Sequence, residues 1–279
     1  NLLLDVNTPP SLGVSTYKEN MGKLANKGIE GNLNAFIFKP GQSKVSWSVF
    51  VNAIHNRNEI KEISNALKKM NEANDQNDQN RPQQRYQEGK SVNSIWAVLS
   101  AGIDPSTGQE LFYDRNGQLT YVWNAEDKVI VGDGIPKVSG NLGTNMTYKG
   151  IQFGAYFSYQ LGAKQYNQTL VDHVENANLS MNVDERVLLD RWTKPGDVTF
   201  FKGLSDVEGN TVTSITNATS RFMQKNNFLN FTSISLGYIL PEAWTSKWKL
   251  KNTRLNLQGN NIFQMSSIQV ERGLAYPFA

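Results

Sequence analysis

Five aromatic residues are the side chains best suited to bind a ligand, and they lie in two long segments between predicted strands. They are Trp96, Tyr113, Tyr121, Trp123 and Trp192. Flat rings beside Asn, Gln and Asp side chains suit a carbohydrate, because rings stack on sugar faces while amides and carboxylates bond the hydroxyl groups. The alternative is that the rings pack as a small core of their own segments. The sequence leaves both interpretations open.

Residues that usually carry catalysis or hold metals are sparse. The chain has no Cys, and its two His, His55 and His173, are too far apart in the sequence to form a local zinc motif. The Asp114-Arg-Asn116-Gly117 stretch lacks the further ligands of a calcium loop and is better interpreted as a turn. We therefore expect no catalytic residue, no metal site and no cofactor, and we do not expect an enzyme.

The composition narrows the class of protein further. Lys and Arg number 28 against 25 Asp and Glu, so the net charge is +3, too small to indicate nucleic-acid binding. Only 19% of the residues are charged, and 32 Asn and 16 Gln make the polarity mostly uncharged. No apolar run approaches the length of a transmembrane helix, but a β-barrel spans a membrane with strands of about 9–11 residues.

Alternation of apolar and polar residues is the main structural signal, because it marks a β-strand with two different faces. The best stretch is 151–164, which follows 138–148 after a tight turn at Gly150. The other alternating segments are 29–37, 45–53, 233–240 and 255–263, and 1–6 reads as the tail of one more strand. We therefore predict about seven strands.

Short and long connections alternate along the chain. Short ones lie near 40–43, 149–150 and 241–250, and long ones span 57–136 and 165–225. This pattern is typical of a transmembrane up-and-down antiparallel barrel with short turns at one end and long extracellular loops at the other. The alternative is a soluble β-sandwich that binds carbohydrate through its loop aromatics. Asn, Gln, Ser and Gly on the polar faces favour a wet barrel lumen.

Other features refine this prediction. Several aromatic residues at or near strand ends fit an interfacial girdle: Trp47, Tyr148, Tyr166, Tyr238, Trp244 and Trp248. Within the long connections we expect short helices over 59–74 and 182–193, and a hairpin that turns at Asn116-Gly117.

Seven stretches, in this order, carry a resemblance to the C-terminal part of SusC-like TonB-linked (TonB-dependent) outer-membrane proteins. They are YKENMGKLANKGIE (17–30), SWSVFVN (46–52), SIWAVLSAGIDPSTGQE (94–110), GDGIPK (132–137), DRWTKPGD (190–197), LGY (236–238) and GNNIF (259–263). Together they cover nearly the whole chain, and their combination is specific.

The resemblance implies a 22-stranded barrel in the bacterial outer membrane, with an N-terminal plug through which the TonB system supplies energy. Family members pair with a SusD-like surface lipoprotein and import oligosaccharides, or in some cases peptides. Residues 1–279 then form the C-terminal portion of such a barrel. We find no plug and no TonB-contacting segment, and the final strand of the family is absent, so we expect the chain to be a segment of a longer polypeptide.

Overall fold

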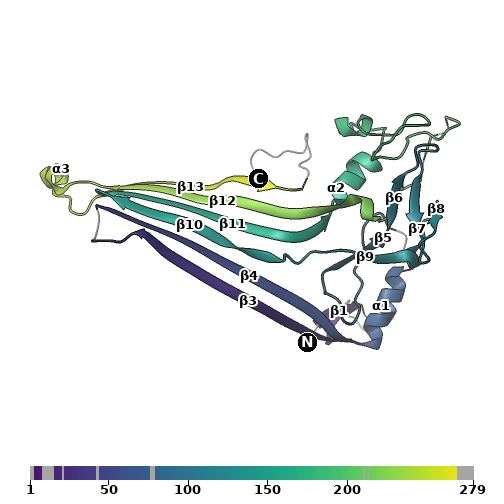
Figure 1. Ribbon diagram of the computed structural model, residues 1–279, viewed down its shortest axis with the longest axis horizontal. Helices are drawn as coiled ribbons and strands as arrows, with labels where there is room; N and C mark the ends of the chain where they lie inside the picture. Colours follow the sequence, from purple (N-terminus) through teal and green to yellow (C-terminus); the bar gives the residue numbers. More distant parts are fainter. Residues whose placement is uncertain are drawn as a thin grey trace.

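The main body of the protein is one antiparallel sheet of six strands, whose order in the sheet is their order in the chain. The computed structural model describes residues 3–7, 16–20, 22–41, 44–75, 79–209, 211–212 and 214–268. Figure 1 shows the strands side by side and strongly elongated. They are β3 (Gly22–Phe38), β4 (Val45–Ile63), β10 (Val138–Tyr148), β11 (Ile151–Tyr166), β12 (Met223–Ile239) and β13 (Arg254–Ser266).

The predicted strands are thereby confirmed, with two differences. β1 (Leu3–Asn7), at the place of the expected first strand, pairs with β2 (Thr16–Asn20) in a separate two-stranded sheet. β3, β4 and β12 have 17, 19 and 17 residues, more than the about 9–11 residues with which a strand spans a bilayer. The six strands lie in a single sheet rather than in two packed layers, which excludes the β-sandwich alternative for this sheet.

One face of the sheet carries an unbroken row of apolar side chains, which we call the apolar ladder. Residues directly opposite each other on neighbouring strands share a face, and the pairing joins Leu33, Val51, Leu142, Phe157, Phe231 and Phe263 across all six strands. Phe157 and Phe231 stack with ring centroids 4.5 Å apart. Ile29 and Leu257 on the same face are 77% and 72% exposed. Such a surface is suited to lipid rather than to water.

An extra residue in β12 keeps this face apolar. Phe231 pairs with Phe157 and Ser233 pairs with Tyr156, so Thr232 is a β-bulge between them. Because side chains alternate with a period of two, one extra residue exchanges the faces of all that follow. Phe231 and Ile234 therefore point to the same side although they are three residues apart.

The short connections gather at one end of the sheet. β10 and β11 are joined by a two-residue turn in which Lys149 and Gly150 have φ of 47° and 85°, the primed geometry that suits a hairpin. β12 and β13 are joined through α3 (Glu242–Thr245) and the short helix η6 (Ser246–Trp248), which Figure 1 shows at its left end. Trp244 and Trp248 are largely exposed there. Among the described residues, no helix is long and apolar enough to cross a membrane.

The long connections fold into a compact body at the other end, on the right of Figure 1. The first contains α1 (Asn65–Asp75), η2 (Ala125–Asp127), a pair of strands, β5 (Ser94–Val98) and β9 (Lys128–Asp133), and a three-stranded sheet of β6 (Ser100–Ile103), β7 (Glu110–Tyr113) and β8 (Leu119–Thr120). The second contains α2 (Gln168–Leu170), the π-helical turn η3 (Val171–Glu175), η4 (Glu185–Leu188) and η5 (Ser220–Phe222).

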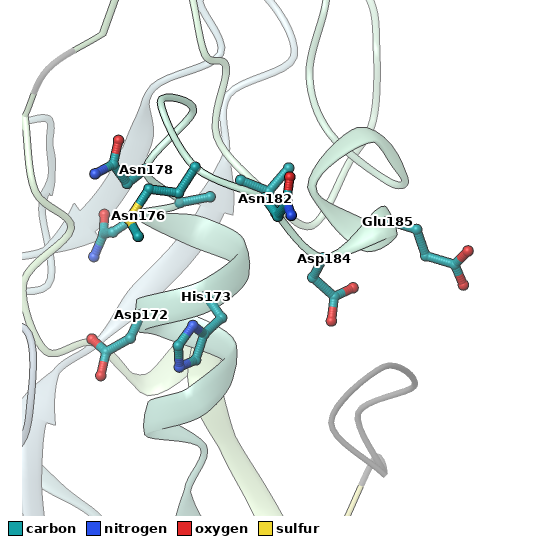
Figure 2. A pocket seen from close by; sticks show the side chains of 10 residues that line it. Asp172, His173, Asn176, Asn178, Asn182, Asp184 and Glu185 are labelled. Carbon is teal, nitrogen blue, oxygen red and sulfur yellow. The ribbon is translucent and has the colours of Figure 1, made fainter.

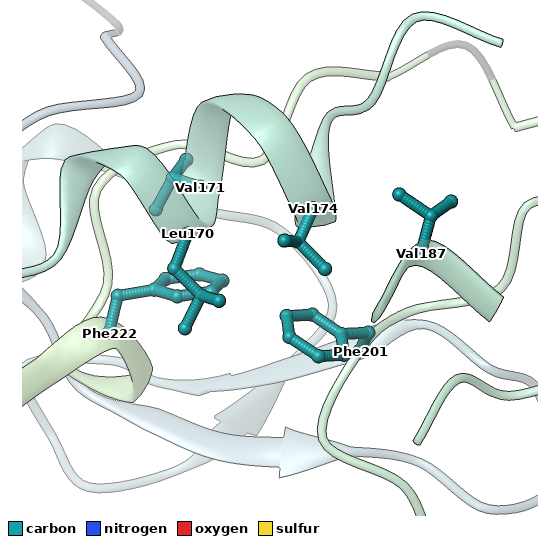
Figure 3. Close-up of a cluster of buried hydrophobic side chains, with 6 residues drawn as sticks. All are labelled: Leu170, Val171, Val174, Val187, Phe201 and Phe222. Atoms are coloured by element: carbon teal, nitrogen blue, oxygen red, sulfur yellow. The ribbon is translucent and has the colours of Figure 1, made fainter. Parts of the chain in front are cut away.

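Apolar cores hold this loop body together. The larger one, shown in Figure 3, consists of buried side chains from the second long connection: Leu170, Val171, Val174, Val187, Phe201 and Phe222. A smaller cluster packs Ile60 against Leu67 and Tyr86. The loops are therefore folded structures with buried side chains.

Two predicted helices have the wrong bounds, although a helix is confirmed within 59–74. Glu59 to Ile63 continue β4 rather than beginning a helix, and α1 begins at Asn65, where the Ser64 hydroxyl accepts the N–H of Leu67 at 3.2 Å. The expected helix over 182–193 is only the four-residue η4. The hairpin at Asn116-Gly117 is confirmed, since β7 and β8 pair across it and Gly117 has a φ of 75°.

Candidate ligand-binding site

A cavity of about 390 Å³ lies between the two long connections and brings two of the predicted aromatic residues together. Tyr121 and Trp123 line it from the first connection, and Lys202 and Thr216 line it from the second. Its other lining residues are mostly small or polar and include Thr107, Gln109, Ser205, Ser214 and Asn217. The cavity therefore combines flat rings with hydroxyl and amide groups.

Hydrogen bonds hold the two aromatic side chains in place just after β8. The Tyr121 hydroxyl donates to Asp104 Oδ2, which raises the pKa of Tyr121 and lowers the pKa of Asp104. Trp123 Nε1 donates to the carbonyl of Ala218 at 3.2 Å, and the Lys128 ammonium lies 5.5 Å from the centre of the ring. Tyr121 is 48% exposed, so its ring remains accessible to a ligand.

A buried ion network lies behind this cavity. Arg221 Nη2 lies 2.6 Å from Glu110 Oε2 and 2.6 Å from Glu175 Oε1. Thr216, which lines the cavity, donates its hydroxyl to Glu175 Oε1 at 2.9 Å. Burial alone would lower the pKa of Arg221, but the charges of Glu110 and Glu175 raise it above its ordinary value. The guanidinium therefore stays charged and fixes one wall of the cavity.

Lys202 is the cation that lines the cavity itself. Its ammonium donates to the carbonyl of Ser214, and burial lowers its pKa. Since the Glu110 carboxylate is paired with Arg221, the lining offers hydroxyls, amides and rings together with few uncommitted charges. This arrangement can bind a polar, uncharged ligand such as a sugar or a peptide backbone.

The other three predicted aromatic residues do not line this cavity. Trp192 is 2% exposed, its Nε1 donates to the carbonyl of Pro105 at 2.9 Å, and its ring lies against Gly108. Trp96 is 7% exposed, with the Arg85 guanidinium 5.0 Å from its ring centre. Tyr113 is exposed on β7. The burial of Trp96 and Trp192 supports the packing interpretation for these two rings.

A second cavity, of about 760 Å³, lies beside η3 and η4 and is shown in Figure 2. Two of its three carboxylates, Asp172 and Asp184, already have partners. Asp172 accepts from Asn80 Nδ2 at 2.6 Å and from Gln168 Nε2 at 2.9 Å. The Arg186 guanidinium lowers the pKa of Asp184 to about 2. No Trp, Tyr or Phe of the described chain lines this cavity, so it is the weaker candidate for a sugar.

His55 and His173 also belong to different places in the fold. His173 lines the second cavity, whereas His55 is in β4, where its Nδ1 donates to the carbonyl of Lys137 at 2.6 Å. In the part of the chain that the structure describes, no three His, Asp or Glu side chains come together in a way that could hold a metal ion.

Sequence reasoning missed the ion network and the second wall of the cavity. Glu110 and Arg221 are 111 residues apart, and Lys202 and Thr216 lie in a segment without alternation. Nothing in the sequence sets Arg221, Glu110 and Glu175 apart from the other charged residues near them. The spacing of these three residues carries no signal of contact.

Comparison with known proteins gives relatives of one kind. No family model matches the chain. TonB-dependent receptor P3 of Formosa agariphila is 25% identical over 281 residues, which are 94% of this chain and 26% of that protein. TonB-dependent receptor P26 of the same organism is 24% identical and is matched over 97% of this chain and 28% of its own length. The chain thus spans about a quarter of the length of the curated relatives it matches.

The fold is similar to that of solved structures. The RagAB peptide transporter superposes with a TM-score of 0.72 and 21% identity, over 95% of this chain and 28% of that one. The RagAB peptide importer in its open-open state gives a TM-score of 0.71. The predicted resemblance to TonB-linked receptors and the transmembrane β-barrel fold are confirmed, and the six strands described above are part of a barrel wall.

Proposed function

We propose that this chain is part of the wall and outer loops of a TonB-dependent outer-membrane importer of the SusC-like type. The observation that carries the proposal is the apolar ladder, which presents large apolar side chains on all six strands and leaves four of them exposed: Leu33, Val51, Leu142 and Phe263. A water-soluble protein would have to cover such a face, whereas a bilayer solvates it.

The opposite face of the sheet suits a water-filled lumen. Asn32 pairs with Asn52 across β3 and β4, and Ser158 pairs with Asn230 across β11 and β12. Farther toward the short turns, Gln152 pairs with Gly237. Small and uncharged polar side chains leave space and hydrogen-bonding groups for a neutral solute passing inside the barrel.

The long-loop end then faces the outside of the cell, and the short turns face the periplasm. The loop body at that end contains the cavity with Tyr121 and Trp123, which would take an oligosaccharide or a peptide during capture. A SusD-like lipoprotein would dock on the loops, and a plug elsewhere in the polypeptide would couple release of the ligand to TonB. The chemistry of the cavity suits a glycan through stacking and a peptide through its amides.

The test is uptake by cells that express the full-length receptor. Cells are offered equal mixtures of oligosaccharides and oligopeptides, and depletion of each from the medium is followed by mass spectrometry. We expect one class to disappear, and we expect deletion of the receptor gene or of tonB to stop its uptake. Uptake that is independent of TonB would contradict active import. A chain that is soluble and monomeric without detergent would contradict membrane placement altogether.

A further inference from the structure

A cavity of about 490 Å³ lies where β4 and β10 separate near the loop body. The last paired residues are Ile54 and Ser139, after which β4 continues to Ile63 beside β3 alone. Figure 1 shows β4 running on past the start of β10. We call this cavity the fork pocket, and it is separate from the cavity that contains Tyr121 and Trp123.

Cations dominate the walls of the fork pocket. Arg57, Lys90 and Lys137 line it, against a single carboxylate from Asp133, so the formal charge is 3 − 1 = +2. Asp133 is already engaged, since its Oδ1 accepts the N–H of Ile135 at 2.9 Å. Among the described residues, none of the three cations forms an ion pair within 4.0 Å. Three cations at one hollow, none of them in a close ion pair, attract an anion.

Local geometry holds two of the polar groups at the pocket. Gly162, with a φ of 83°, lies so close to the Lys137 stem that an added Cβ would be 2.8 Å from Cγ, so the stem packs on bare backbone. His55 Nδ1 donates to the Lys137 carbonyl at 2.6 Å. Because a carbonyl only accepts, Nδ1 carries the proton, and this bond holds the ring beside the pocket.

The position of the fork pocket relative to the apolar ladder indicates the source of the anion. His55 pairs directly with the highly exposed Ile29, and Arg57 pairs with Lys27. The side chains of His55 and Arg57 therefore lie on the same face of the sheet as the apolar ladder. They are nearer to the long loops than Val51, the ladder residue of β4. Charged groups at this level meet the headgroup layer of the outer leaflet.

We propose that the fork pocket binds a phosphate group, and that the phosphate belongs to a lipid headgroup of the outer leaflet. This inference rests on the proposed placement of the long loops outside the cell. The cations contact the phosphate, while the apolar ladder below them contacts the acyl chains. The binding ties the receptor to an anionic lipid without involving the ligand cavity.

The test uses the full-length receptor in detergent and measures lipid binding rather than import. The probe is lipid A, compared with dephosphorylated lipid A and with inorganic pyrophosphate, and bound mass is read by native mass spectrometry. The variant is Arg57→Gln with Lys90→Gln and Lys137→Gln. The matched control is Lys247→Gln with Lys249→Gln and Lys251→Gln, three exposed cations at the short-turn end.

We expect wild type and control to bind lipid A equally, and each cation removed from the fork pocket to weaken binding about fivefold. Dephosphorylated lipid A should bind wild type as weakly as lipid A binds the triple variant. Undiminished lipid A binding by the triple variant would overturn the proposal, and pyrophosphate binding as tight as lipid A would show a soluble-anion site instead.

Two further controls keep the result interpretable. If the triple variant does not fold, Lys90→Glu and Lys137→Glu are tested singly, because both side chains are exposed, and unchanged lipid A binding by both overturns the proposal. Uptake is measured in parallel. A receptor that binds lipid A through these cations but imports nothing refutes only the proposed function.

Discussion

Arg221 Nη2 lies 2.6 Å from Glu110 Oε2, and this contact joins the two long connections across 111 residues of chain. Both side chains are about 95% buried. The same guanidinium bonds Glu175 and donates to the carbonyl of Phe200, so it ties β7, η3 and η5 into one body. The wall of the cavity that Tyr121 and Trp123 line therefore depends on a charge that comes from the other loop.

Replacing Arg221 with Met should loosen the loop body. The change leaves Glu110 and Glu175 buried without their cation, and breaking a buried pair from one side costs about 3–5 kcal/mol. We expect amide hydrogen exchange to speed up in segments 108–113 and 170–176, while the strands below keep their protection. The measurement is hydrogen exchange of the full-length receptor read by mass spectrometry.

Arg115→Met is the matched control for this experiment. Arg115 Nη1 is 4.0 Å from Glu126, and both side chains are largely exposed, so the pair contributes little. Adding Glu110→Gln and Glu175→Gln to Arg221→Met should restore part of the protection, because the unpaired charges are then removed. Equal exchange in Arg221→Met and wild type would refute the coupling of the loops.

The sequence predicts the barrel wall well because the signal there is local. The alternation within each strand is enough to assign Leu142 or Phe157 to the apolar face, and the neighbouring strands need not be known. The short turns then pair β3 with β4, β10 with β11, and β12 with β13. The bulge at Thr232 is not predictable in this way, since only the pairing with Tyr156 and Phe157 reveals it.

The loop body is less predictable because its contacts are distant in sequence. Ile60 and Ile63 have a helical spacing with Leu67, yet pairing with β3 extends β4 as far as Ile63, so tertiary contacts override the local preference. Aromatic residue type identifies Tyr121 and Trp123 but does not separate them from the buried Trp192. Burial depends on Gly108 and on the Pro105 carbonyl, which no spacing rule connects to residue 192.

A charge on the apolar ladder should impair insertion of the barrel. Leu142 is 37% exposed on that face and lies in the middle of the sheet, between Val51 and Phe157. Leu142→Arg would place a cation in lipid at a cost of about 2–4 kcal/mol. We expect less heat-modifiable, folded receptor in outer-membrane fractions on gel electrophoresis. Asn141→Arg on the opposite face is the control, and equal losses from both variants would contradict the assignment of the faces.

Removing the rings in the ligand cavity should weaken binding of the imported ligand. Tyr121→Ala and Trp123→Ala each delete one aromatic contact, for which we expect a loss of about threefold to tenfold in affinity. Isothermal titration calorimetry of the purified receptor complex measures it, with the ligand class found in the uptake test. Tyr113→Ala removes an exposed ring outside the cavity and serves as the control. The ligand site lies elsewhere if Tyr113→Ala has the largest effect of the three.

Two glycines with the same backbone conformation should respond differently to Ala. Gly108 and Gly117 have φ of 73° and 75°, so a Cβ strains either one by a similar amount, about 1 kcal/mol. At Gly108 the added Cβ would also lie 2.5 Å from the Trp192 ring, whereas at Gly117 nothing lies within 4 Å.

Gly108→Ala must therefore displace Trp192 from its site beside Pro105, and Gly117→Ala leaves that packing intact. We expect trypsin to cut after Arg191 in the Gly108→Ala receptor at concentrations that spare the Gly117→Ala receptor and wild type. The cut sites are identified by mass spectrometry of the fragments. Identical cleavage of the two variants would mean that backbone strain alone, and not the contact with Trp192, determines the susceptibility to trypsin. Trp192 would then not hold the two loops together.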